Sequence, residues 1–193
     1  MSRIEKLKKK IDTLYQAKYP HRADWADWLY KNHIFVVAGY AEQLADRFHA
    51  NKEWAMAAGM LHDIADAVMA RENPQHEAES LAIARRLLKE SDFAEEEIKT
   101  IVDDAIRFHS CHGDDVPETI EGKVMATADA FAHLSTDFYD HALELFQKES
   151  SMEEIRSWAL PKIERDYRKK IFFNEVREET VGDYERIKRL FTT

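Results

Sequence analysis

The chain has 193 residues, a formal net charge of −9 and a hydrophobic fraction of 45%. This length suits one domain, or one domain with a helical extension. The acidic balance argues against a nucleic-acid polymer as a partner, because dedicated nucleic-acid binders carry a basic face. No stretch reaches the roughly 18 apolar residues of a membrane span, and the basic N-terminus lacks the apolar core of a signal peptide. The single cysteine, Cys111, cannot form an internal disulfide, which favours a reducing, cytoplasmic location.

Glycine and proline are scarce, with five and four residues, which favours long helices over many strands and turns. Apolar residues recur at helical spacing, and capping residues and prolines divide the pattern into blocks. The predicted helical segments are residues 3–19, 24–48, 52–71, 74–89, 91–108, 118–148 and 151–191, with a loop at 110–117. Pro161 and Gly182 are expected to kink or divide the last segment. The sequence therefore predicts an all-α fold: a compact multi-helix bundle with extra N- and C-terminal helices.

These blocks suggest one globular unit with three parts. Residues 1–23 supply an N-terminal helix that packs on a core of residues 24–150, and residues 151–193 form a C-terminal helical extension. The sequence leaves a homo-oligomer open.

Four polar side chains stand where a helical core would carry apolar ones. His33 lies on the apolar stripe of the second block, His62 and Asp63 lie within the run AAGMLHDIADAVMA, and Asp129 interrupts KVMATADAFAHL. A buried carboxylate without a partner costs several kcal/mol, so it must be neutralised, paired or bound to a metal. Two inward aspartates with two inward histidines fit a divalent cation better than a single salt bridge. Such ligands suit Mn, Fe, Co, Ni or Zn, and carboxylate-rich versions also accept Mg.

The order of these residues resembles the H…HD…D signature of the HD superfamily of metal-dependent phosphohydrolases. The resemblance covers about residues 24–150, where LHDIAD holds the HD pair and ATADAF holds the distant aspartate. It implies that His33, His62, Asp63 and Asp129 bind one metal inside a core of five or six helices. It also implies that the terminal helices shape a substrate pocket.

The resemblance suggests roles for three further residues. Asp66 lies three positions after Asp63, where related hydrolases carry an acidic residue that assists proton transfer, and we interpret Asp63 and Asp66 as the catalytic pair. His76 and His109 are candidates for a second metal, because two-metal branches carry extra histidines in similar places. Those branches often have an adjacent histidine pair near the position of His109, whereas this chain has His109-Ser110-Cys111-His112.

The resulting expectation is hydrolysis of a phosphoester in a small anionic molecule, such as a nucleotide or related metabolite, by metal-activated water. Lys123 and Arg22 are candidates for holding the substrate phosphate. Two alternatives remain at this point. One is a diiron oxygenase on the same fold, for which His76 and His109 would have to be ligands. The other is a non-catalytic domain that binds a nucleotide or partner protein around a structural metal.

Overall fold

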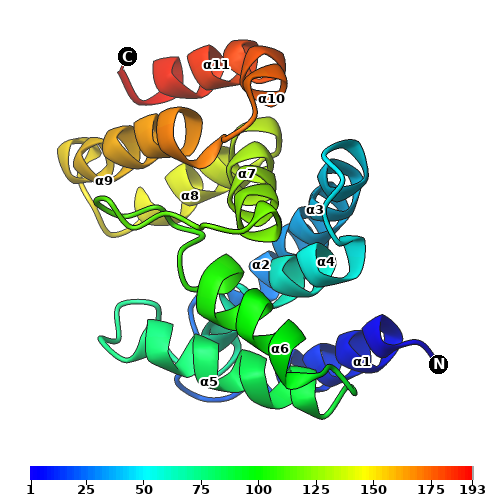
Figure 1. The fold of residues 1–193 in the computed structure, drawn as a ribbon. Helices are drawn as coiled ribbons and strands as arrows, with labels where there is room; N and C mark the ends of the chain where they lie inside the picture. The colour runs from blue at the N-terminus through cyan, green and yellow to red at the C-terminus, as the bar shows by residue number, and fades with distance from the viewer. Residues whose placement is uncertain (193) are drawn as a thin grey trace.

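The computed structural model describes residues 1–192, and the regular secondary structure in that range is entirely helical (Figure 1). This confirms the all-α prediction. The α-helices are α1 (Arg3–Gln16), α2 (Ala26–Leu29), α3 (Phe35–Arg47), α4 (Lys52–Leu61), α5 (His76–Lys89), α6 (Glu95–Ile98), α7 (Ile120–Ser135), α8 (Phe138–Phe146), α9 (Met152–Arg165), α10 (Asn174–Glu179) and α11 (Val181–Thr192). The π-helical segments are η1 (Tyr30–Ile34), η3 (Lys99–Ile106) and η4 (Asp166–Lys170), and η2 (Ile64–Ala67) is a 3₁₀ helix.

Two predicted helices are shorter than expected. The segment 52–71 ends as an α-helix at Leu61 and continues through the 3₁₀ segment η2. The segment 118–148 breaks between α7 and α8, where Thr136 has an extended backbone. The hydroxyls of Ser135 and Thr136 donate hydrogen bonds to carbonyls four residues earlier, at 2.7 Å each. Side chains of this kind compete with the helical backbone, which accounts for the break.

The C-terminal segment also divides differently from the prediction. Pro161 lies inside α9 without ending it, and Gly182 lies in the first turn of α11. The helical path instead changes at Ile171, whose backbone is extended, and again at Thr180 between α10 and α11.

Helices α3, α4 and α7 pack against one another at the centre of the molecule, with α1, α5 and α6 at one end and α8 to α11 at the other (Figure 1). The contact between α3 and α4 depends on Gly59. A Cβ atom at Gly59 would lie 2.8 Å from the Cα atom of Ala38, so any larger residue would push the two helices apart. This close contact positions the end of α4, where the HD pair follows.

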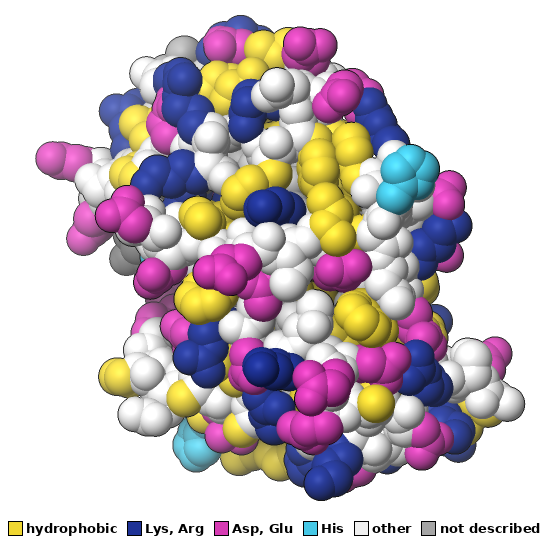
Figure 2. All heavy atoms as spheres, viewed as in Figure 1, with side chains coloured by type: hydrophobic (Ala, Val, Ile, Leu, Met, Phe, Trp, Pro, Cys, Tyr) yellow, Lys and Arg dark blue, Asp and Glu magenta, His cyan; other side chains and the backbone are white. Residues whose placement is uncertain are grey.

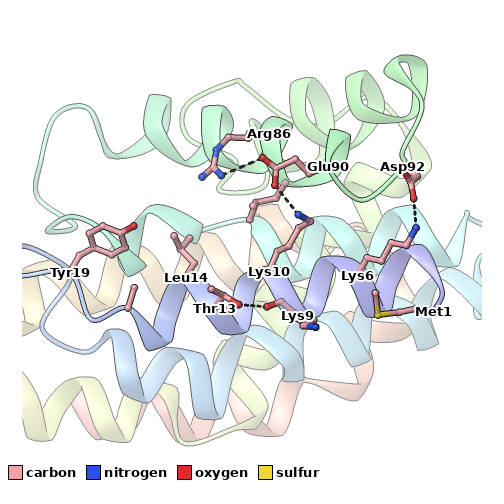
Figure 3. Close-up of a pocket in the computed structure, with 12 residues that line it drawn as sticks. Met1, Lys6, Lys9, Lys10, Thr13, Leu14, Tyr19, Arg86, Glu90 and Asp92 are labelled. Carbon is pink, nitrogen blue, oxygen red and sulfur yellow. Dashed lines mark hydrogen bonds and ion pairs between the residues drawn. The ribbon is translucent and has the colours of Figure 1, made fainter.

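The N-terminal helix α1 packs on α4 and α5 through its buried side chains Leu7 and Ile11. Figure 3 shows α1 alongside α5, with Lys10 paired to Glu90 at 2.9 Å and Lys6 paired to Asp92. A hollow of about 640 Å³ lies here, but no histidine lines it and its acidic groups are held by these lysines. The hollow therefore offers no ligand set for a metal.

The C-terminal extension folds back onto α7. The Thr127 hydroxyl of α7 donates to the Lys170 carbonyl at 3.1 Å and accepts from the Phe172 backbone N–H at 3.1 Å. This pair of bonds fixes the end of η4 beside the middle of α7. As a result, residues from the last quarter of the chain reach the same region as Asp129.

Acidic and basic side chains are intermixed over the face shown in Figure 2, and that face has no single basic patch. No helix in residues 1–192 is both long and apolar enough to cross a membrane.

Candidate functional site

Three buried polar side chains from separate elements converge at the centre of the molecule. His33 comes from the π-helical segment η1, His62 follows the last residue of α4, and Asp129 lies in the middle of α7. They are 3%, 2% and 1% exposed. π-helical turns are rare and often occur at functional sites, because the extra residue changes which face of the helix carries a given side chain.

The ligating atoms of His33, His62 and Asp129 all lie within 4.8 Å of one another. Asp129 Oδ1 is 3.2 Å from His33 Nε2 and 3.6 Å from His62 Nε2. The His62 ring donates from Nδ1 to the Gly59 carbonyl at 2.9 Å, so its Nε2 lone pair faces Asp129. A histidine oriented through its second nitrogen in this way is typical of metal ligands.

Asp63 extends this group toward His109. His62 Nε2 lies 3.7 Å from Asp63 Oδ2, and His109 Nε2 lies 3.9 Å from Asp63 Oδ1. His62, Asp63 and His109 form a second trio of compatible ligand atoms that shares His62 with the first. His109 also donates from Nδ1 to the Ile106 carbonyl at 2.6 Å, which orients its Nε2 in the same manner as in His62.

The protonation states of these groups suit a metal. Burial lowers the pKa of His33, and it lowers the pKa of His109 to about 4, so both imidazoles are neutral near pH 7. Burial alone would raise the pKa of Asp129, but His133 and Lys170 outweigh it and hold that pKa well below the usual value. Neutral imidazoles and charged carboxylates are the forms that bind metals.

His33 Nδ1 is buried without a hydrogen bond within the described part of the chain, and so are two atoms that lie 3.6 Å apart in the centre: His62 Nε2 and Asp129 Oδ1. Buried polar atoms without partners are rare in native proteins and call for an explanation. A divalent cation bound between His62 Nε2 and Asp129 Oδ1 satisfies both, so the donor set fits the metal that the sequence predicts.

The structure does not bring Asp66 or His76 into either ligand trio. The sequence argument placed Asp66 one helical turn after Asp63, but α4 has already ended, and the 3₁₀ geometry of η2 directs the Asp66 carboxylate elsewhere. It accepts from Arg71 and lies 2.9 Å from His76 Nε2. Asp66 is 1% exposed and is not among the residues lining the cavity, whereas His76 is. Asp66 therefore positions Arg71 and His76.

The two residues suggested for phosphate binding lie away from the cavity. Arg22 forms a two-bond ion pair with Asp27, at 2.7 and 2.5 Å. Lys123 is in the first turn of α7, six residues before Asp129, and does not line the cavity. Neither residue therefore lines the cavity in which a phosphate would lie next to the candidate metal ligands.

Several residues of the site were missed by the sequence argument. His133 lies 3.4 Å from Asp129 Oδ1, one turn further along α7, and its i+4 spacing could have revealed it. Lys170 donates to Asp129 Oδ2. Lys162, Asp166 and Lys170 are also spaced four residues apart, which indicates a common face, but only the fold brings that face to Asp129.

The candidate metal ligands open onto a cavity of about 230 Å³. Five basic side chains line it: Arg71, Arg107, Lys162, Arg165 and Lys170. Arg71 also donates to Asp63 at 2.8 Å, and fixes that carboxylate at the rim. A cavity with carboxylate and imidazole at its base and cations on its walls can hold a small anion close to a metal.

Comparisons with known proteins agree with this geometry. The chain is similar over 95% of its length to a solved structure from an uncultured Thermotogales bacterium, described as a predicted HD superfamily hydrolase. The two share 18% identity with a TM-score of 0.61, and 90% of that chain is covered, so the similarity concerns the fold. No curated protein matches. The sequence model of the HD domain matches residues 30–134, which include His33, His62, Asp63 and Asp129. Because that match spans more than half of the chain, the protein belongs to the HD domain family.

Proposed function

We propose that this protein hydrolyses a phosphoester bond in a small phosphorylated molecule, such as a nucleotide or a related metabolite, with a divalent cation held by His33, His62, Asp63 and Asp129. The observation that carries the proposal is the buried centre itself, in which unpartnered ligand atoms face one another beneath a cation-lined cavity. HD domains bind divalent metals, and the family match supports hydrolase chemistry at that general level.

A bound divalent cation lowers the pKa of a coordinated water and neutralises phosphoryl oxygens. The chain's own residues orient the ligands and attract the substrate. Arg71 holds Asp63 in place, and backbone carbonyls orient the imidazoles of His62 and His109, so these side chains need little rearrangement. The lysines and arginines on the walls attract an anionic substrate in spite of the net charge of −9. The small volume restricts what enters beside the ligands.

The test combines metal analysis with a phosphoester panel on one sample reconstituted with Mn, Co or Ni. His62→Ala and Asp63→Ala should lose both metal binding and turnover while helical content, measured by circular dichroism, persists. His21→Ala is the matched control, since His21 is exposed and lies outside the cavity. A fully active, metal-loaded Asp63→Ala variant would contradict the proposal.

The two alternative functions give different results in the same experiment. A diiron oxygenase requires two irons per chain and oxygen-dependent turnover, with His76 and His109 as ligands. The contact of His76 Nε2 with Asp66 at 2.9 Å argues against His76 as such a ligand. A structural metal in a non-catalytic domain would give a metal-loaded protein that hydrolyses no member of the panel.

A further inference from the structure

A second, larger groove adjoins the metal cavity. It has a volume of about 740 Å³ and is bordered by residues of α8, α9 and the segment before α2. Its apolar lining includes Trp25, Phe138, Phe146 and Trp158. The rings form a continuous wall, with Trp25 and Phe146 centroids 5.9 Å apart and Phe146 and Trp158 centroids 4.8 Å apart. Pockets of this volume and lining commonly hold small organic molecules.

The groove and the metal cavity are continuous. Five residues line both: Arg71, His112, Phe138, Lys162 and Arg165. A molecule with its phosphoryl group at the metal ligands would extend past these residues into the groove. The metal cavity alone, at about 230 Å³, is too small for a substantial organic group.

Arg165 differs from the other cations at this junction. Lys162 pairs with Asp166 at 3.0 Å, Lys170 pairs with Asp129, and Arg71 pairs with Asp63. Among residues 1–192, by contrast, no hydrogen bond or ion pair holds the Arg165 guanidinium, and its Nε atom is buried without a partner. The chain has 37 acidic and 28 basic residues, so carboxylates outnumber basic side chains. An arginine without a carboxylate partner where two cavities meet is therefore unusual in this protein.

The chemistry of that position points to an anion. An arginine guanidinium offers five donors in a planar fork that matches phosphate and carboxylate oxygens. The positive charge of Arg165 also affects the neighbouring His112. Burial is the larger cause of the lowered pKa of His112, and repulsion from Arg165 is the second. Arg165 lies in α9, beyond residues 30–134, so it belongs to the part of the chain that the family model does not cover.

We propose that Arg165 binds the substrate's phosphoryl group at the mouth of the metal cavity, while the aromatic groove holds the organic leaving group, so that the preferred substrate is a phosphomonoester of an aromatic alcohol. This inference rests on the proposed function for its reaction, but the binding it describes can be measured without turnover. Arg165 thus contributes to substrate affinity, and the groove sets the preference between leaving groups.

The experiment measures binding of 1-naphthyl phosphate and of glycerol phosphate to the metal-free protein by titration calorimetry, and KM for both with the metal-loaded protein. Arg165→Met should weaken binding and raise KM for both compounds about tenfold or more, as expected for loss of a charge-assisted hydrogen bond. Arg165→Lys keeps the charge and should recover part of the loss. Trp158→Leu should weaken binding of the naphthyl compound alone.

Arg168→Met is the control, because Arg168 is an arginine three residues further along the chain that pairs with Glu164 at 2.6 Å and lines neither cavity. Equal binding by the Arg165→Met and Arg168→Met variants would overturn the role of Arg165. Equal binding of the two compounds by the unaltered protein would overturn the role of the groove.

The outcomes also separate this inference from the proposed function. Binding of naphthyl phosphate through Arg165 without hydrolysis of any phosphoester would overturn the proposed function and retain the binding site. Hydrolysis with an unchanged KM in Arg165→Met would retain the function and overturn the inference.

Discussion

Replacing Asp166 by asparagine should destabilise the protein more than any single surface substitution. Asp166 is 0% exposed, accepts a hydrogen bond from the Tyr139 hydroxyl at 2.6 Å and lies 3.0 Å from Lys162 and 3.1 Å from His133 Nδ1. Lys170 Nζ is 3.6 Å away. The variant would leave Lys162 without a carboxylate and Lys170 with Asp129 alone. Removing one partner of a buried charge pair typically costs about 3–5 kcal/mol, because the remaining charge stays desolvated.

Urea unfolding followed by circular dichroism measures this loss. Asp140→Asn is the control: Asp140 pairs with Arg186 at 3.3 Å on the surface, and such pairs contribute about 1 kcal/mol or less. A loss for Asp166→Asn no larger than that of the control would refute the idea that Asp166 balances the buried lysines.

The stabilisation that Asp166→Asn removes should also depend on pH. Burial would raise the pKa of Asp166, but Lys162 and His133 outweigh it and hold the pKa far below its ordinary value. A lowered carboxyl pKa stabilises the fold above the unfolded pKa of about 3.9, and this stabilisation is lost as pH falls through the folded pKa. The stability difference between the protein and Asp166→Asn should therefore be constant from about pH 7 to 5 and should shrink below about pH 4.

Two further substitutions test the supports of the site. Gly59→Ala should lower the free energy of unfolding by about 1–3 kcal/mol, because its Cβ would press on the Ala38 backbone; an unchanged denaturation midpoint would contradict the close contact of α3 and α4. Asp104→Ala should cost about 1–2 kcal/mol, since Asp104 accepts from the backbone N–H groups of Glu118 at 2.8 Å and Thr119 at 3.1 Å just before α7. Thermal unfolding of Asp103→Ala, which loses only the ion pairs with Arg85 and Arg107, provides the comparison.

The sequence predicted site residues correctly where a polar side chain interrupted an apolar helical pattern. His33, His62 and Asp129 each interrupt an apolar helical stripe, and the fold brings all three together. The argument worked because an inward position on an amphipathic helix can be recognised from spacing alone. Asp63 was found in the same way, through its neighbour His62.

The sequence argument failed for side chains whose position depends on local backbone geometry or on packing between distant segments. Asp66 would face the cavity if α4 continued through it, but the helix ends at Leu61, and no strong breaker marks that end in the sequence. Lys170 reaches Asp129 across 41 residues because Thr127 binds the end of η4. Arg165 carries no local signal in the sequence, because what distinguishes it is the lack of a carboxylate partner among residues 1–192.

The π-helical segments have a consequence for how this site tolerates insertions and deletions. Each residue advances an α-helix by about 100°, and a π turn accommodates one extra residue without shifting the turns on either side. Deleting one residue between Tyr30 and Asn32 would let η1 relax to an ordinary helix, with α3 still in register on α4. The imidazole of His33 would then rotate away from Asp129. The π-helical turn is therefore the backbone form in which the His33 imidazole lies 3.2 Å from Asp129.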